Sequence, residues 1–181
     1  CRIISHRGEH DNRHVLENTL QAFDRIQACG AWGVEFDVRW TKDLHPVIFH
    51  DDDLKRLFNS NDKICDLQMV DLRRDFPAIP TLETVVHKYG KKLHLMVEIK
   101  NEKYPDSKRQ NKILANIFKS LQPSIDFHCM SLHPEIFKIF DFLPPEAFLP
   151  IARAHVNRFS ELALAHHYGG VTGHFLLLSN R

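Results

Sequence analysis

Short apolar runs alternate with amphipathic segments along most of this 181-residue chain. Runs that are rich in β-branched and aromatic residues, or that alternate strictly between polar and apolar residues, predict strands. The predicted strands are residues 2–5, 33–40, 46–49, 93–99, 125–132, 147–152 and 175–178. The helices predicted from apolar spacing cover about 17–28, 82–89, 113–121, 136–143 and 159–167. This alternation indicates a parallel sheet with helical crossovers, and a closed barrel and an open sheet both fit it.

One segment interrupts the alternation. Residues 54–80 are polar and irregular, and the run 59–62 reads Asn-Ser-Asn-Asp, so we predict an excursion over the surface. We treat residues 1–181 as one domain with an inserted segment around 52–80, because this length is ordinary for a domain. Neither GxGxxG nor GxxxxGK[ST] occurs, which disfavours the common nucleotide-binding sheets.

Composition narrows the function classes. The chain is 43% hydrophobic and 26% charged with a formal net charge of +1, and this near-zero charge argues against a general nucleic-acid binder. No run approaches the roughly 18 apolar residues that a membrane-spanning helix needs. We therefore expect no transmembrane segment, and a cytoplasmic protein. The sequence leaves the oligomeric state open.

Two carboxylates lie two residues apart in the predicted strand 33–40. Period two places Glu35 and Asp37 on the same face of that strand. Two buried like charges are costly unless a cation or a basic group offsets them. Together with Glu98 from another predicted strand, they would supply the oxygen ligands that Ca²⁺ or Mg²⁺ prefers. The alternative is a solvated strand face with only the even-numbered residues buried, and the residues alone leave both open.

Histidine and basic side chains follow other predicted strands, at the rim where a parallel barrel gathers catalytic groups. His6 and His50 each end an apolar run, and such a pair can divide acid and base work, although both could be polar strand caps. Arg7 directly follows His6, and Lys100 lies two residues after the candidate metal ligand Glu98. Arginine suits bidentate phosphate recognition and lysine suits a point charge on a phosphate oxygen, but either could also neutralise carboxylates.

Two further polar groups have structural interpretations. The run Glu17-Asn18-Thr19 opens the first predicted helix, where it could cap the helix or hold the loop of an active site. Thr41 and Asp43 have the chemistry of a turn, in which such side chains bond to nearby backbone, and we assign them a structural role.

Read in order, these motifs resemble the glycerophosphodiester phosphodiesterase family. They are ISHRGEHDNRHVLENTLQAF, GVEFDVRWTKDLHPVIFHDDDLKRL, IPTLETVV and LMVEIK. Each motif is weak alone, but their order and spacing over the first hundred residues are highly specific. Beyond Lys100 the resemblance is reduced to CMSLHPEIFKIF and the rhythm of the strands.

The resemblance implies a TIM-type (β/α)₈ barrel of the phospholipase C-like phosphodiesterase kind. It also implies metal-dependent hydrolysis of a small glycerophosphodiester to glycerol 3-phosphate and an alcohol, with Ca²⁺ or Mg²⁺ as the metal. The matching positions are Glu35, Asp37 and Glu98 for the metal, His6 and His50 for acid–base work, Arg7 and Lys100 for the phosphate, and Glu17, Asn18 and Asp51 as supporting residues. Asp51 could orient His50.

The C-terminal part departs from the family pattern. The last strands of the family usually carry a Trp-Thr-Val-Asn-like and a Gly-Val-Asp-Gly-like motif, and neither occurs here. A barrel of this kind needs roughly 250 residues, and an unclosed barrel would expose strand edges. A missing or disordered tail, a partner chain that completes the barrel and a reduced fold would each account for this. We favour the first, so we expect a C-terminally incomplete domain that lacks its last strands.

Two other functions compete with this hydrolase. A phospholipase D-like relative would act on lipid, but segment 41–51 favours the glycerophosphodiesterase branch, and no apolar docking stretch is evident. A catalytically silent binding protein on the same fold is favoured by the short C-terminus. The complete set of candidate catalytic residues argues against it. The alcohol head group, the metal and the assignment of acid and base to the two histidines stay open.

Overall fold

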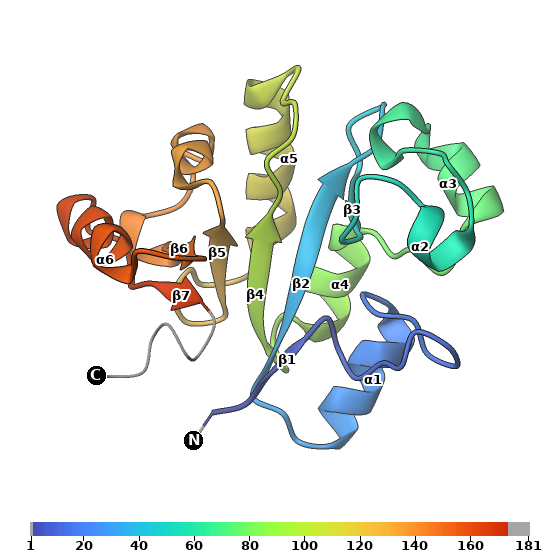
Figure 1. The fold of residues 1–181 in the computed structure, drawn as a ribbon, viewed down its shortest axis with the longest axis horizontal. Helices are drawn as coiled ribbons and strands as arrows, with labels where there is room; N and C mark the ends of the chain where they lie inside the picture. The colour runs from blue at the N-terminus through green and yellow to red at the C-terminus, as the bar shows by residue number, and fades with distance from the viewer. Residues whose placement is uncertain (1, 174–181) are drawn as a thin grey trace. The chain divides into compact units, whose positions relative to one another are not determined.

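The computed structural model describes residues 2–173, and the predicted strand 175–178 lies outside them. The chain divides into two compact units, one that ends at Val97 and one that begins at Glu98 (Figure 1). The boundary falls inside strand β4 (His94–Ile99), so each unit contains part of this strand. Whether the chain is one domain, as the sequence suggests, stays a prediction.

The N-terminal unit consists of the strands and helices from β1 to the start of β4. In chain order they are β1 (Ile4–His6), α1 (Leu20–Ala28), β2 (Gly33–Trp40), β3 (Pro46–Ile48), α2 (Lys55–Phe58), the 3₁₀ helix η1 (Ile64–Asp66), α3 (Met69–Asp75), α4 (Leu82–Tyr89) and the start of β4. The strand order is β1-β2-β4, and β3 pairs with β2. Strand β1 runs parallel to β2, whereas β3 runs antiparallel to it.

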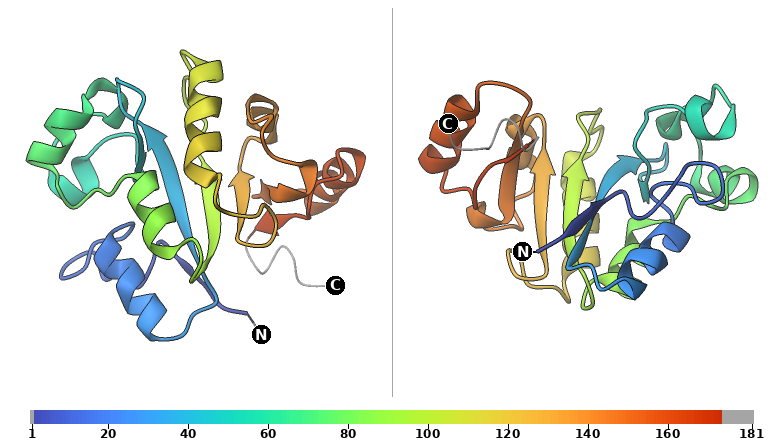
Figure 2. Two further views of the ribbon diagram at one scale, coloured as in Figure 1. Left: turned by 180° about the vertical axis from the view of Figure 1, so that it is seen from behind. Right: turned by 60° about the horizontal axis from the view of Figure 1, so that its bottom comes forward.

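Helices α1 and α4 cover one face of β2. The Phe23 ring of α1 lies 5.9 Å from the Phe36 ring of β2 and 5.7 Å from the Tyr89 ring of α4, measured between ring centroids. Both helices are seen on this face when the molecule is turned around (Figure 2). Their N-termini are capped by Thr19 and Thr81, whose hydroxyl oxygens accept hydrogen bonds from backbone N–H groups of the first turn.

The first helix begins later than predicted. We expected it to start near Glu17, but α1 starts at Leu20, after the cap at Thr19. The reason is local, because Asn18 has a left-handed backbone with φ of 57°, which no helix interior allows. The run 17–19 therefore forms the loop before the helix and its cap.

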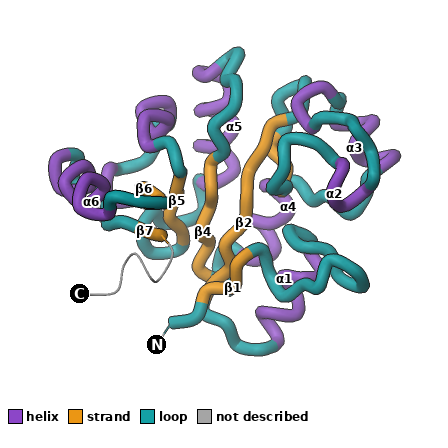
Figure 3. Tube along the Cα trace, in the orientation of Figure 1, coloured by secondary structure: helices purple, strands orange, loops and turns teal. Residues whose placement is uncertain are grey.

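The prediction of an irregular surface excursion over 54–80 was wrong in one respect. The segment contains α2, η1 and α3 (Figure 3). Its apolar residues join Val47 of β3 and Phe49 in one cluster. The members from the segment are Leu54, Ile64, Met69, Leu72 and Ile79, and Leu57, Phe58, Leu67 and Phe76 pack against them. The apolar residues are too scattered for a helical period, so the sequence pattern did not reveal this cluster.

The C-terminal unit continues the alternation from the end of β4. Its elements are α5 (Ser107–Phe118), β5 (Phe127–Ser131), the 3₁₀ helices η2 (Pro134–Ile139) and η3 (Pro145–Ala147), β6 (Phe148–Ala152), α6 (Val156–Ala165) and β7 (Thr172–Gly173). The strand order is β4-β5-β6-β7, and the β5–β6 and β6–β7 pairs are parallel. Stacked rings join Phe118 of α5 to Phe127 of β5, and Phe137 of η2 to Phe148 of β6.

Two predictions in this unit need correction. The helix predicted over 136–143 is instead the 3₁₀ helix η2, which ends at Ile139, so apolar spacing alone misidentified the helix type. Helix α5 begins at Ser107, six residues before the first apolar position that we used, because Asp106 caps a polar first turn.

Candidate active site

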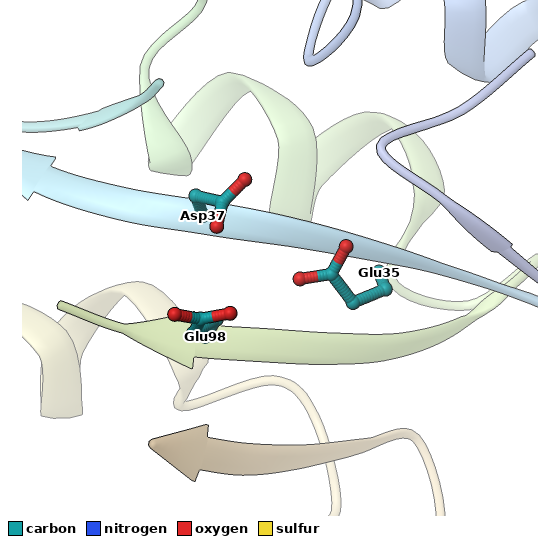
Figure 4. A group of neighbouring side chains, drawn as sticks. All are labelled: Glu35, Asp37 and Glu98. Atoms are coloured by element: carbon teal, nitrogen blue, oxygen red, sulfur yellow. The ribbon is translucent and has the colours of Figure 1, made fainter. Parts of the chain in front are cut away.

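Strand β2 carries two buried carboxylates on the face opposite α1. Phe36 packs against α1, so the odd-numbered side chains of β2 point the other way. Glu35 and Asp37 are only 6% and 0% exposed, which excludes the solvated strand face that the sequence left open. Figure 4 shows both carboxylates turned toward Glu98, which projects from β4. One oxygen from each of the three residues lies within 4.8 Å of the others.

The donor set of this carboxylate triad fits a hard divalent cation. Three oxygen donors within this distance match the ligand type and spacing that Ca²⁺ and Mg²⁺ use. The Asn18 side-chain oxygen is also buried and has no hydrogen-bond partner among residues 2–173, so it could face a cation or its hydration water. Basic groups lie beside the triad: Lys100 Nζ lies 2.6 Å from Glu98, and Arg7 Nε lies 3.4 Å from Asp37.

A left-handed turn after β1 brings Arg7 to this triad. Arg7 and Gly8 have φ angles of 58° and 82°, and a Cβ on Gly8 would lie 2.7 Å from the Cβ of Ala22. Only glycine therefore allows α1 to pack this closely against the turn. The Arg7 guanidinium then reaches both Asp37 and Glu17, with Nη1 at 2.9 Å from the Glu17 carboxylate.

The loop before α1 supplies the next two predicted residues. The Asn18 side-chain amide donates a 2.8 Å hydrogen bond to the same oxygen of Asp37 that Arg7 approaches. Glu17 is 4% exposed and accepts hydrogen bonds from Arg7, Asn12 and Arg56. Burial raises the pKa of Glu17, but Arg56, Asn12 and Arg7 outweigh it and hold this pKa at about 2.

His50 and Asp51 form a second pair at the end of β3. His50 Nδ1 lies 2.7 Å from Asp51 Oδ1, so the predicted orientation of His50 by Asp51 is present in the geometry. Burial raises the pKa of Asp51, but hydrogen bonds from Arg56 and His50 lower it below its usual value. An ionised carboxylate only accepts, so Nδ1 of His50 carries a proton in this contact, and Nε2 lies on the opposite side of the ring. The backbone carbonyl of His50 also accepts two hydrogen bonds from Arg39.

His6 lies beside the triad at the end of β1. Its Nε2 is 3.7 Å from Glu35 Oε2. Partial burial and the positive charge of Arg7 lower its pKa below the ordinary value, in part opposed by Asp37. A neutral imidazole can accept a proton, so this environment suits a base.

Thr41 and Asp43 have the structural role that we assigned them. The Thr41 hydroxyl donates to Asp43 and accepts from the backbone N–H of His45, and Asp43 accepts from the backbone N–H of Met69. The turn after β2 is therefore tied to the start of α3.

The structure adds two residues that sequence reasoning missed. Arg56 contacts both Glu17 and Asp51, and Asn12 contacts Glu17. The motif HDDDLKRL contained Arg56, but nothing in its spacing indicated a contact with a residue 39 positions earlier.

Comparison with known proteins identifies the family. Residues 6–157 match the sequence model of the glycerophosphoryl diester phosphodiesterase family, which is most of the chain. The chain belongs to this family. A glycerophosphodiester phosphodiesterase of Caldanaerobacter subterraneus is 36% identical over 111 residues, which cover 55% of this chain and 45% of that protein. The chain spans less than half the length of the curated relatives that it matches first.

Solved structures of family members share the fold. The Thermotoga maritima glycerophosphodiester phosphodiesterase superposes with a TM-score of 0.77 at 26% identity, covering 96% of this chain and 74% of that one. A phosphodiesterase of Oleispira antarctica, solved with the product sn-glycerol-3-phosphate, gives 0.79 at 23% identity, covering 99% and 77%. The fold is thus the TIM-type α/β fold of this family, and the predicted family and fold class are confirmed.

Within residues 2–173, no helix combines the length and the apolar character that crossing a bilayer requires.

Proposed function

We propose that this phosphodiesterase-family chain hydrolyses glycerophosphodiesters to glycerol 3-phosphate and an alcohol, with Ca²⁺ or Mg²⁺ bound by Glu35, Asp37 and Glu98. The observation that carries the proposal is the buried carboxylate triad with Arg7 beside it. Three buried carboxylates form an unfavourable group in the absence of a cation, which supports metal binding as their purpose. Family membership supports the reaction class.

The phosphate of the substrate would lie between the triad and the basic side chains. Arg7 already holds a buried carboxylate pair and has the planar donor set that binds phosphate oxygens. Lys100 pairs with Glu98 and can turn one N–H toward the phosphate. The bound cation would supply Lewis-acid stabilisation of the charge on the phosphoryl oxygens.

The two histidines would divide the proton transfers. His50, with its Nδ1–H held by Asp51, presents Nε2 for proton exchange in a fixed tautomer. His6 beside Glu35 would do the complementary step. The nucleophile would be water, which gives glycerol 3-phosphate directly, or the glycerol hydroxyl of the substrate, which gives a cyclic phosphate that a water molecule then opens. On either route one histidine takes the proton of the nucleophile, and the second histidine gives a proton to the leaving alcohol oxygen. Glu17, Asn18 and Asp51 hold Arg7, Asp37 and His50 in place.

A lipid substrate, acted on as by phospholipase D-like relatives, is the second candidate. The Oleispira antarctica protein with bound sn-glycerol-3-phosphate supports the small substrate, because its fold matches this chain over nearly the full described length. A silent binding protein is disfavoured, because the candidate catalytic side chains are complete.

The test is release of glycerol 3-phosphate from glycerophosphocholine and glycerophosphoethanolamine by the purified protein. Each reaction is run with Ca²⁺, with Mg²⁺ and with a chelator, and the Glu35→Gln variant serves as the matched control. Release that needs one of the ions and is lost in Glu35→Gln supports the proposal. A folded protein that releases nothing from either substrate, but cleaves lysophospholipid vesicles, would favour the lipid enzyme instead.

A further inference from the structure

One arginine of the inserted segment joins two parts of the candidate site. Each of the three guanidinium nitrogens of Arg56 donates a hydrogen bond: Nη1 and Nη2 lie 3.0 Å and 2.5 Å from the two oxygens of Glu17, and Nε lies 2.6 Å from Asp51. The contact with Glu17 is bidentate, the geometry in which arginine binds carboxylates most specifically. Glu17 in turn holds Arg7, and Asp51 holds His50.

The position of Arg56 is fixed by the apolar cluster of the inserted segment. Arg56 lies on α2, a helix of only four residues that would not be stable alone. Leu54 directly before the helix is fully buried, and Leu57 and Phe58, the last two residues of α2, pack against the same cluster. The cluster therefore holds α2, and α2 carries the guanidinium to Glu17 and Asp51.

The negative charges of Glu17 and Asp51 explain why both carboxylates need Arg56. Glu17 is almost completely buried and has two arginines around it, and a buried carboxylate without them would be expensive. Asp51 has only His50 and Arg56 as recorded charged neighbours within the described residues. Loss of Arg56 would leave Asp51 free to rotate away from Nδ1 of His50.

We propose that Arg56 is a positioning residue for the phosphodiester reaction: it orients Asp51 on Nδ1 of His50 and, through the shared Glu17, couples this histidine to the phosphate-binding Arg7. The expected loss of kcat rests on the proposed function. The orientation of Asp51 and His50 by Arg56 does not depend on it. The inserted segment is then part of the catalytic architecture, and its apolar cluster serves to place one side chain.

The test compares Arg56→Gln with a matched control from the same segment. Arg74→Gln is the control, because Arg74 lies on α3 and pairs only with Asp71 and Asp75 at the surface among the residues described. We expect Arg56→Gln to lower kcat by about 10- to 100-fold, the usual cost of losing a group that orients a catalytic side chain. Arg74→Gln should match the wild type. Guanidinium ion added to Arg56→Ala should restore part of the lost rate, because it can occupy the vacated position.

A spectroscopic measurement separates positioning from a general structural effect. In wild type the ¹⁵N spectrum should show His50 as the Nδ1–H tautomer, and Arg56→Gln should show a mixture of the two tautomers. The His50 signals are identified by their loss in His50→Gln. A low kcat in Arg56→Gln with an unchanged His50 spectrum would overturn the positioning role, as would unchanged kcat and spectrum together.

This design also distinguishes the two proposals from each other. If wild type released no glycerol 3-phosphate, the proposed function would fail, and the His50 spectrum would still decide whether Arg56 orients the Asp51–His50 pair. If wild type is active and the spectrum of Arg56→Gln is that of wild type, only the role of Arg56 fails. Circular dichroism on each variant confirms that it is folded.

Discussion

Both faces of strand β2 are buried, but one carries apolar side chains and the other carries carboxylates. Val34, Phe36 and Val38 are 0–1% exposed and pack as an ordinary core, with Phe36 against Phe23 of α1. On the opposite face, Asp37 is 0% exposed and Glu35 6%, although both are acidic. Burial alone therefore does not separate a stabilising position from a functional one. The neighbouring side chains separate the two kinds of position, because one face contacts apolar rings and the other contacts Arg7, Asn18 and His6.

This contrast predicts opposite responses to substitution. Removing a side chain from the apolar face should cost stability, since it leaves a cavity. Removing a charge from the acidic face should cost function and can even increase stability, since it relieves repulsion between buried carboxylates. The following experiments test this division.

The largest effect is expected on the apolar face. Phe36→Ala should lower the free energy of unfolding by about 3–5 kcal/mol, the range for a fully buried phenylalanine. Urea denaturation measures it, and Val70→Ala, at a position that is 70% exposed, is the control that should change little. A loss below that of the control would mean that this face does not form the core.

Next in size is the loss of the proposed acid–base residue His50. His50→Ala should lower turnover of glycerophosphocholine by about 10²-fold, which corresponds to about 2.7 kcal/mol of transition-state stabilisation. His87→Ala, an exposed histidine on α4, is the matched control. Equal turnover in the two variants would remove His50 from the mechanism.

The pH dependence of stability should reveal the paired carboxylate beside Arg7. The pKa of Glu17 is about 2 in the folded protein against an ordinary value of 4.5, so its charge stabilises the fold above about pH 4.5. This contribution, on the order of 3 kcal/mol, should be lost as the pH falls from 4.5 toward 2. Unfolding free energies of wild type and Glu17→Gln should therefore converge over this interval. Parallel curves would contradict the assignment.

The smallest effect tests the acidic face itself. In a chelator, Glu35→Gln should be slightly more stable than wild type, by roughly 2–4 °C in Tm, the shift that about 1 kcal/mol produces in a chain of this size. Added Ca²⁺ or Mg²⁺ should raise the Tm of wild type and leave that of Glu35→Gln nearly unchanged. Asp37→Asn should behave in the same way. Equal stabilisation of all three proteins by metal would show that the ion binds elsewhere.

Much of the fold and the placement of the three carboxylates could be predicted from sequence. Strict alternation over 33–40 placed Glu35 and Asp37 on one face, and the structure shows them there with Glu98 nearby. This worked because period two is a local property of a strand. The roles of these residues, and of His6, His50, Arg7 and Lys100, remain predictions that the experiments above test.

The features that sequence reasoning missed depend on contacts over long distances or on single backbone angles. Arg56 meets Glu17 across 39 positions, and only the apolar cluster of the inserted segment brings them together. The start of α1 was set by the left-handed backbone at Asn18 rather than by apolar spacing. In place of the helix predicted over 136–143, the chain forms the 3₁₀ helix η2, in which Ile136 and Phe137 are also buried.

The glycine after Arg7 has a consequence for reading mutational scans of this chain. Because a Cβ on Gly8 would meet the Cβ of Ala22 and the ring of Phe23, any side chain there would push α1 away from the turn. Activity would be lost without any reacting group having changed. A saturation library would therefore score Gly8 like a catalytic residue, and a compensating Phe23 replacement by a smaller side chain would expose the difference by recovering part of the loss.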